Sequence, residues 1–271
     1  MLASERLESS KVQEHESLAQ ALLDHIFGLQ RYQVILNDAM KIAQPHLDKF
    51  YELLGRLECH EPFQYVVGEC EFFGLRFIVN QDVLIPRPET EELVSWILKY
   101  VNLKHPHILD IGTGTGCIPI SLCKNAPGKY YAYDISVGAL AVAKKNAELN
   151  EASVSFEEVD ILHQPIGLQD LDVVVSNPPY ISMDEKALMS RNVLDFEPHL
   201  ALFPVSTDFL IFYRTIATKA FKALKKGGKL FFEMNEYASD AIQQIMQDAG
   251  FLNIVQHQDL QGKNRMIVGQ R

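Results

Sequence analysis

A four-residue motif late in the chain could do chemistry on a planar –NH₂ group. Asn177-Pro178-Pro179-Tyr180 directly follows Val173–Ser176, whose β-branched residues predict a buried strand. The prolines donate no N–H, so the carbonyls there stay free as acceptors, and the Asn177 side-chain oxygen is another acceptor. Together they can accept both hydrogens of the group, while Tyr180 stacks on it. Taken alone, the motif is more typical of a proline-stiffened loop than of a functional site.

An amide or aromatic amine is a poor nucleophile because its lone pair is delocalised. Acceptors on both N–H bonds favour the geometry that frees the lone pair, and positioning and electrostatics then supply the catalysis. The motif therefore predicts methyl transfer from a sulfonium to nitrogen without a strong general base. The catalytic and substrate-binding residues would be Asn177, Pro178, Pro179 and Tyr180.

A glycine-rich turn provides a candidate cofactor site. The apolar run Ile108–Ile111 leads into glycines at 112, 114 and 116, where positive φ and close approach of a ligand are possible. The helix that follows offers free N–H groups at its start. A dinucleotide fingerprint has its third glycine one residue later, so a tight turn without ligand explains the loop alone equally well.

Acidic residues at successive strand ends favour the cofactor interpretation. Asp134 ends the strand Lys129–Asp134, where a carboxylate meets ribose hydroxyls in doubly wound folds. Asp160 ends the next strand and would lie beside an adenine ring. Asp110, inside the first strand, could accept from the loop or from a cofactor amine.

Alternating helix and strand patterns after residue 90 predict the scaffold that positions these residues. Strands are expected at 107–111, 129–134, 154–159, 171–176 and 229–233, with two more in 253–271. This order predicts an α/β fold with a doubly wound, mostly parallel sheet and an antiparallel C-terminal edge.

The preceding residues predict a small N-terminal helical domain. Apolar residues recur at helical spacing in Leu18–Ile26 and Pro45–Leu57, whereas the aromatic and β-branched stretch 63–79 predicts a β-hairpin. We expect a helical domain that recognises substrate over 1–62, a β-hairpin linker over 63–85 and a catalytic domain over 86–271.

Composition excludes several classes of protein. The 271 residues are 47% hydrophobic and 22% charged, as in globular proteins, and the net charge of −10 argues against a protein that lives on nucleic acid. The four cysteines have no C-x-x-C spacing, so no metal site is expected. The N-terminus lacks the apolar core of a signal peptide, and no apolar run could span a membrane. We therefore expect a cytoplasmic protein without membrane contacts.

Beyond these motifs, the chain resembles the bacterial glutamine-N5 methyltransferases that modify peptide chain release factors. The most specific segment is Ile85-Pro-Arg-Pro-Glu-Thr-Glu91, since the glycine loop and Asn-Pro-Pro-Tyr are shared with many amino-methyltransferases. A sister family that methylates a ribosomal protein has serine and proline after the Pro-Arg pair. Further segments of the resemblance are Glu61–Gly68, Glu71–Gly74, Leu109–Gly116, Ser176–Ile181, Phe196–Phe203 and Asp259–Arg265.

The resemblance implies a class I methyltransferase fold, S-adenosylmethionine as cofactor, and class I release factors as partners through the glutamine of their Gly-Gly-Gln loop. Arg87, Pro88 and Thr90 would close the methionine end, and Glu197 and Pro198 would lie in a loop near the target. Ile161 stands where the family often has an aromatic residue, so adenine would pack on an aliphatic face. The implied cofactor residues are Gly112, Thr113, Gly114, Thr115, Gly116, Asp134, Ile161 and Asn177.

Three alternative functions stay open on the sequence. An adenine-N6 methyltransferase could use the same amine clamp but would have to flip its base out of the stack, and the chain has no basic target-recognition domain. A ribosomal-protein glutamine methyltransferase is the second alternative. A non-catalytic cofactor-binding module is the third, and it leaves Asn177–Tyr180 unexplained.

Overall fold

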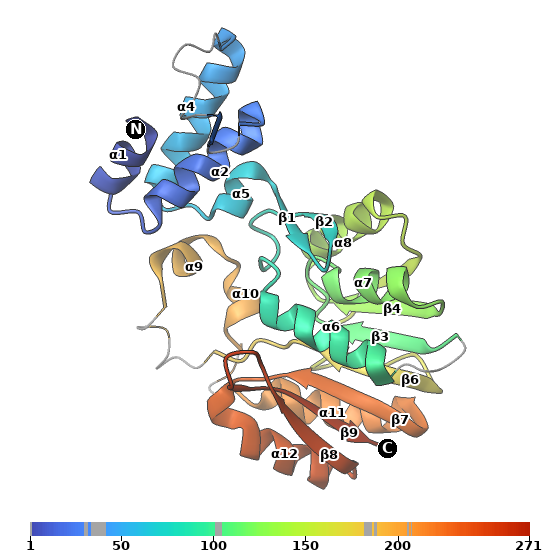
Figure 1. Ribbon diagram of the computed structural model, residues 1–271. Coiled ribbons are helices and arrows are strands. Elements are labelled where there is room, and N and C mark those ends of the chain that lie inside the picture. The colour runs from blue at the N-terminus through green and yellow to red at the C-terminus, as the bar shows by residue number, and fades with distance from the viewer. Residues whose placement is uncertain are drawn as a thin grey trace. The chain divides into compact units, whose positions relative to one another are not determined.

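The computed structural model describes residues 2–29, 32–33, 42–100, 105–181, 186, 189–204, 206 and 208–271. The chain divides into two compact units (Figure 1). The first comprises Met1–Gly68 with Ser190–Phe196, and the second comprises Glu69–Met189 with Glu197–Arg271.

The first unit is helical. Pro45 lies in the first turn of α4, where its missing N–H is harmless. Leu7, Leu22 and Leu54 are fully buried in a shared core, and an Arg6–Glu58 ion pair of 2.6 Å joins α1 to α4. The helices of this unit are α1 (Leu2–Ser9), α2 (His15–Phe27), α4 (Gln44–Glu58), α5 (Phe63–Val67) and α9 (Arg191–Phe196).

The predicted hairpin over 63–79 is wrong in its first part, because residues 63–67 form helix α5. Tyr65 and Val66 are buried, and the Arg56 guanidinium donates to both of their carbonyls at 3.0 Å. These tertiary contacts satisfy the helix end and override the strand propensity of the segment. The hairpin itself is shorter, with strands β1 (Glu69–Phe72) and β2 (Leu75–Ile78).

The second unit is built on a seven-stranded sheet of order β5-β4-β3-β6-β7-β9-β8. The first five strands are parallel and β9 runs antiparallel to β7 and β8, which confirms the predicted α/β fold. The strands are β3 (His107–Ile111), β4 (Lys129–Asp134), β5 (Val154–Glu158), β6 (Leu171–Ser176), β7 (Leu224–Glu233), β8 (Leu252–Gln258) and β9 (Asn264–Gln270).

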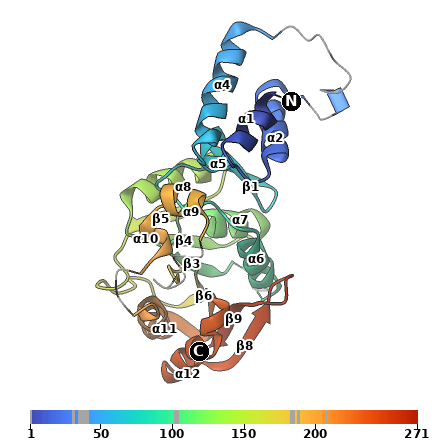
Figure 2. The same ribbon diagram turned by 90° about the vertical axis from the view of Figure 1, so that its left-hand side faces the viewer.

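Helices cover both faces of the sheet (Figures 1 and 2). One core lies beneath α6 (Pro88–Tyr100), α7 (Cys117–Asn125) and α8 (Val137–Leu149), and the other beneath α11 (Ile211–Ala223) and α12 (Ser239–Asp248). Shorter pieces are α10 (His199–Leu202) and the 3₁₀ turn η2 (Glu236–Ala238). None of the described helices has the length and apolarity needed to cross a bilayer.

The β1–β2 hairpin is part of the core rather than a linker. Phe72 is 1% exposed and Phe77 is fully buried, and both pack in one cluster with Leu93 and Trp96 of α6. Asn146 of α8 exchanges hydrogen bonds with both peptide groups of Ile78, at 2.6 and 3.0 Å. The second unit therefore includes the hairpin and begins at Glu69.

We predict that Phe77→Ala lowers the free energy of unfolding of this unit by about 3–5 kcal/mol, the usual loss for a buried phenylalanine. Trp96, the only tryptophan, lies in the same cluster, so its fluorescence in urea reports this unit. Glu71→Ala on the exposed side of the hairpin is the matched control. A loss below about 1 kcal/mol for Phe77→Ala, as for an ordinary surface substitution, would assign the hairpin to a linker after all.

Candidate functional site

The glycine loop is a tight turn between β3 and α7. Gly112, Gly114 and Gly116 all have positive φ (74°, 53° and 78°), a region that other residues adopt only with strain. At Gly116 a side chain would also meet Ile120 Cδ1 at 3.0 Å. The loop can therefore keep its backbone N–H groups beside the start of α7 only because these positions are glycine.

Asp134, at the end of β4, lies against this loop. One carboxylate oxygen accepts from the Gly114 N–H at 2.9 Å and the other from the Ser136 N–H at 2.9 Å. Burial raises the pKa of Asp134, while these backbone hydrogen bonds act in the opposite direction. The side chain stays partly exposed, and each oxygen has a second lone pair for a ligand hydroxyl.

The loop is also held by Asn146, a buried residue of α8 that the sequence analysis did not single out. Asn146 is fully buried and donates to the Thr115 carbonyl at 3.0 Å, besides its two bonds to Ile78. All three bonds are to backbone groups, so the amide ties α8 to the loop and to the hairpin. Its signal in the sequence was a polar residue on the apolar face of an otherwise predictable helix.

Asn177 and the glycine loop are neighbours because their strands are paired. Ile111 and Ser176 are register partners at the ends of β3 and β6, and the Ser176 hydroxyl donates to the Ile111 carbonyl at 2.7 Å. The next residues follow side by side, so that a Cβ on Gly112 would lie 4.0 Å from the Asn177 carbonyl oxygen. The Asn177 side chain makes no hydrogen bond within the part of the chain that the structure describes, and it is partly exposed.

Asp110 is a buried carboxylate next to the loop. It is fully buried, and within the described ranges no hydrogen bond of good geometry reaches either of its oxygens or the Thr113 hydroxyl. Burial raises the pKa of Asp110 to about 7, although the Thr113 side chain and the Ile111 backbone lie close enough to lower it, and the charge of Asp134 acts in the same direction as burial. Because an unpartnered buried carboxylate is costly, the chemistry here fits a ligand that carries an amino group.

Asp160 and Ile161 differ from expectation. The strand β5 ends at Glu158, and the Asp160 carboxylate bonds within its own loop, to the Leu162 N–H at 2.9 Å and to His163 at 2.6 Å. Ile161 is 7% exposed and belongs to a hydrophobic core, so only a small part of its side chain could contact an adenine ring.

The residue before α6, Arg87, is partly exposed and pairs with a buried carboxylate. The Arg87 guanidinium donates to Glu197 at 2.6 Å, and the Ile85 N–H donates to the second carboxylate oxygen at 3.4 Å. Glu197 is 3% exposed; burial raises its pKa, and Arg87 acts against that rise. The ion pair thus joins Arg87, which the resemblance placed at the methionine end of the cofactor, to Glu197, which it placed in a loop near the target.

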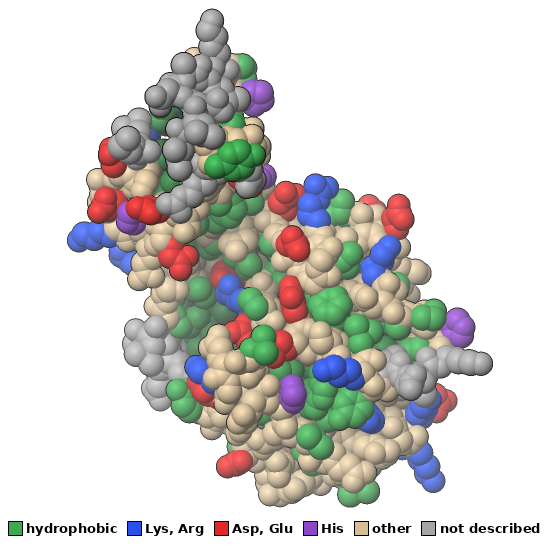
Figure 3. Space-filling view, in the orientation of Figure 1, with side chains coloured by type: hydrophobic (Ala, Val, Ile, Leu, Met, Phe, Trp, Pro, Cys, Tyr) green, Lys and Arg blue, Asp and Glu red, His purple; other side chains and the backbone are tan. Residues whose placement is uncertain are grey.

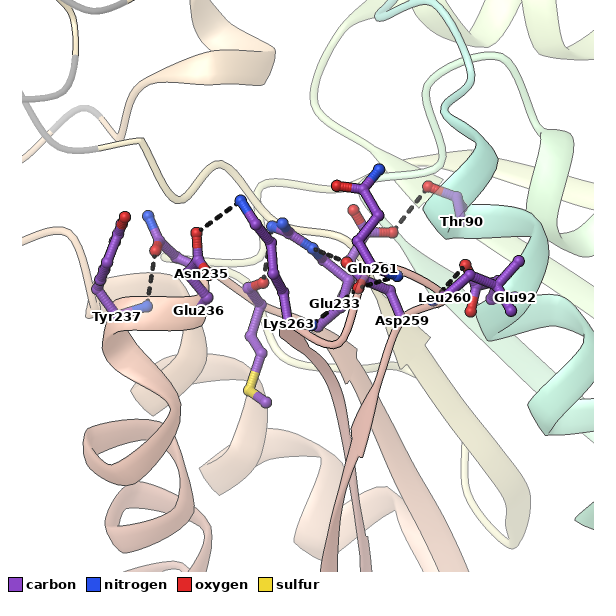
Figure 4. A network of polar contacts seen from close by, with 12 residues as sticks. Thr90, Glu92, Glu233, Asn235, Glu236, Tyr237, Asp259, Leu260, Gln261 and Lys263 are labelled. Atoms are coloured by element: carbon purple, nitrogen blue, oxygen red, sulfur yellow. Dashed lines mark hydrogen bonds and ion pairs between the residues drawn. The ribbon is translucent and has the colours of Figure 1, made fainter.

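A second buried carboxylate, Glu233, ends β7 (Figure 4). It is 1% exposed and accepts from the Thr90 hydroxyl at 2.7 Å and from the Tyr180 hydroxyl at 3.5 Å. Its own carbonyl accepts from the Tyr213 hydroxyl at 3.1 Å. Sequence reasoning missed Glu233, although a carboxylate that ends a run of buried residues was a usable signal.

The carboxyl ends of β3, β4, β6 and β7 therefore gather most of the predicted residues. The glycine loop, Asp134 and Asn177–Tyr180 lie along this edge, with Thr90 tied to it through Glu233. Among the described residues, no group of three His, Cys, Asp or Glu side chains could hold a metal ion.

We predict that Arg87→Met lowers the free energy of unfolding by about 1–3 kcal/mol at neutral pH, because Glu197 then loses the partner of a buried acceptor. Without Arg87, the pKa of Glu197 in the folded state rises further above its unfolded value. The folded variant then binds more protons than the folded wild type, so the deficit grows as pH rises above the folded-state pKa of Glu197 in the wild type, which is itself raised by burial. Urea denaturation over a pH series measures it.

The double variant Arg87→Met with Glu197→Gln is the control, since it removes the buried charge together with its partner. It should show no pH-dependent deficit. A deficit in Arg87→Met that stays constant across the series would mean that the ion pair contributes packing rather than charge.

Comparisons with known proteins agree with this arrangement. Residues 1–68 match the model of the PrmC N-terminal domain, and residues 90–196 match the Methyltransferase small domain. A Pyrococcus furiosus methyltransferase of known structure has the same fold, with a TM-score of 0.55 and 18% identity, over 73% of this chain and 90% of that one.

Two relatives are similar over nearly their whole length. The chain is 44% identical to the release factor glutamine methyltransferase of Flavobacterium psychrophilum, over 94% of this chain and 91% of that protein. It is 40% identical to the protein of the same name from Bacteroides thetaiotaomicron, over 96% and 94%. Identity of this extent, on a sheet that carries the glycine loop beside Asn177–Tyr180, shows that the chain belongs to the family of release factor glutamine methyltransferases.

Proposed function

We propose that this protein methylates the side-chain nitrogen of the glutamine in the Gly-Gly-Gln motif of class I peptide chain release factors, with S-adenosylmethionine as cofactor. The observation that carries the proposal is the contact between the glycine loop and Asn177, at the ends of the register partners β3 and β6. It supports the proposal because the glycine loop and the candidate amide acceptors lie side by side in a chain of this family.

The cofactor would be held by groups that the fold leaves available. The carboxylate of Asp134 keeps lone pairs that suit the hydroxyl-bearing part of the molecule, and Asp110 suits its amino group. The glycines let the backbone approach the ligand closely, while the N–H groups of Gly112, Gly114 and Gly116 already donate within the protein. S-adenosylmethionine supplies an electrophilic methyl group, whose transfer leaves the S–C electron pair on sulfur and releases one amide proton to solvent.

The substrate amide would be oriented by Asn177–Tyr180. The Asn177 side-chain oxygen and a carbonyl of the Asn177–Pro178 segment accept its two hydrogens, and the Tyr180 ring packs on its plane. Pro178 is buried, so the backbone there is fixed by packing as well as by its ring. These residues act by position and need no proton transfer of their own.

Family membership favours a release factor over a ribosomal protein or an adenine base as substrate. The face drawn in Figure 3 agrees, since acidic and basic side chains are interspersed on it rather than gathered into a basic patch. Nucleic acid recognition depends on such patches.

Peptide mapping tests the proposal directly. A purified class I release factor is incubated with the enzyme and cofactor, and its fragments are analysed by mass spectrometry, with duplex and single-stranded nucleic acid as parallel substrates. We expect one methyl group on the glutamine of the motif and none on nucleic acid. Methylation elsewhere in the release factor, or of the nucleic acid alone, would contradict the assignment.

We predict that Asn177→Ala slows methyl transfer about 10²–10³-fold, the usual loss for one preorganised group, with cofactor affinity largely kept. Asn177→Asp keeps an acceptor and should retain more activity than Ala. Single-turnover rates and calorimetric titration of the cofactor separate the two effects. Asn125→Ala, at the far end of α7, is the matched control. A wild-type rate for Asn177→Ala would remove the amide clamp from the mechanism.

We further predict that the first helical unit is needed for recognition of the intact release factor. A chain shortened to begin at Glu69 keeps the hairpin and should bind cofactor, but should methylate the intact release factor far more slowly than the full chain. A chain that begins at residue 82 lacks Phe72 and Phe77 and should not fold stably. If the Glu69 chain methylates the intact protein at the full rate, the helical unit has no role in recognition.

A further inference from the structure

Glu233 stands between two segments of the site. Its buried carboxylate accepts one hydroxyl hydrogen bond from Thr90, at the start of α6, and one from Tyr180, directly after the two prolines. In Figure 4, Thr90 and Glu233 point toward one another from α6 and the end of β7. We propose that Glu233 is a positioning residue for methyl transfer, which restrains the tilt of the Tyr180 ring through its hydroxyl and thereby the position of the ring offered to the substrate amide. This inference rests on the proposed function.

Three restraints would then act on Tyr180. Pro178 and Pro179 fix the backbone before it, and its ring packs against the core beneath α11 and α12. Packing against the core restrains rotation of the ring about its own axis. The hydrogen bond from the hydroxyl to Glu233, at 3.5 Å, restrains the tilt of the ring, because the hydroxyl oxygen is the atom that tilting moves most.

Packing gives no reason for a carboxylate at this position. Phe231 and Phe232 precede Glu233 on the same strand and are fully buried. An apolar side chain would therefore complete the strand without the desolvation penalty of a charge, and buried charges often contribute no net stability. The penalty is explained if the carboxylate holds groups from other segments, which here are Thr90 and Tyr180.

The charge state of Glu233 is set by its surroundings. Burial raises its pKa to about 7, while the Thr90 hydrogen bond and the charge of Arg265 act in the opposite direction. Below this pKa the carboxyl group carries a proton that occupies one of the acceptor positions, so the tether to Tyr180 weakens as pH falls. The titratable groups that face Glu233 from the surrounding elements are Glu89, Cys117, Tyr180, Tyr213 and Arg265.

The test is the single-turnover rate of methylation of an intact release factor, with saturating cofactor, across pH values on both sides of 7. The wild-type rate should fall as pH drops through this range. We call this fall in rate with falling pH the pH step. Glu233→Gln should be slower by up to about 10²-fold, as for a misplaced reacting group, and should lack the pH step. Its cofactor affinity should stay unchanged.

Tyr180→Phe provides the second arm, because it keeps the ring and removes only the hydroxyl. It should lose the same pH step, and the double variant with Glu233→Gln should be no slower than the slower single variant. Additive losses would show that Glu233 acts by a route other than Tyr180 and would overturn the proposal.

Asp172→Asn is the matched control. Asp172 is also a buried carboxylate, but it lies at the opposite end of β6, where it pairs with Lys225 and accepts from the His107 N–H at 2.8 Å. This variant should lose stability without a change in the pH step. If it loses the step as well, the step reports general stability and the proposal fails.

Other outcomes of these experiments distinguish failure of the proposed function from failure of the inference about Glu233. An inactive wild-type enzyme contradicts the proposed function, whereas an active one with a Glu233→Gln variant of wild-type rate and pH profile contradicts only this inference. Loss of cofactor affinity in Glu233→Gln would assign it a merely structural role. If Glu233→Gln does not fold, Tyr180→Phe decides, since a wild-type profile in that variant overturns the proposal.

Discussion

The parallel register of β3, β4, β6 and β7 is the constraint on which the site depends. Parallel strands end at the same edge of a sheet, so the direction of the strands alone brings the loops that follow them to that edge. Here the partners Ile111 and Ser176 bring Gly112 beside Asn177, and the hydrogen bond from Ser176 to Ile111 locks the two strand ends together. A slip of the β6 register by one residue would turn Asn177 to the other face of the sheet.

Buried polar side chains hold the segments around this edge, each in a different way. Asn146 bonds only to backbone and ties the loop and hairpin to α8. Glu197 is neutralised by Arg87 and joins two segments far apart in the sequence. Glu233 bonds to hydroxyls of Thr90 and Tyr180. Because each loses its partners if one segment moves, the segments keep one arrangement, at an energetic cost that apolar residues would avoid.

Local pattern explains why the strands, most helices and the glycine loop could be predicted. Leu109 and Val174 alternate with Ile108 and Val173, and the two sets pack into the cores on opposite faces of the sheet. Local pattern wrongly predicted a strand for residues 63–67, because their conformation depends on Arg56, a residue outside the segment. Propensity measures local preference, and tertiary hydrogen bonds outweigh it in a segment of five residues.

The sequence by itself determined the succession of strands and helices along the chain, the glycine turn, and the residues Asn177–Tyr180 that suit an amide. These features depend on residue type and short spacing. Only the tertiary structure decided which distant groups meet. Asn146 stands out in the sequence only as a polar residue on an apolar helix face, and its partners Thr115 and Ile78 are known from the structure alone. Glu233 lies 53 residues from Tyr180 and 143 from Thr90, and pairings at such separations are set by strand order and helix packing, which no short pattern encodes.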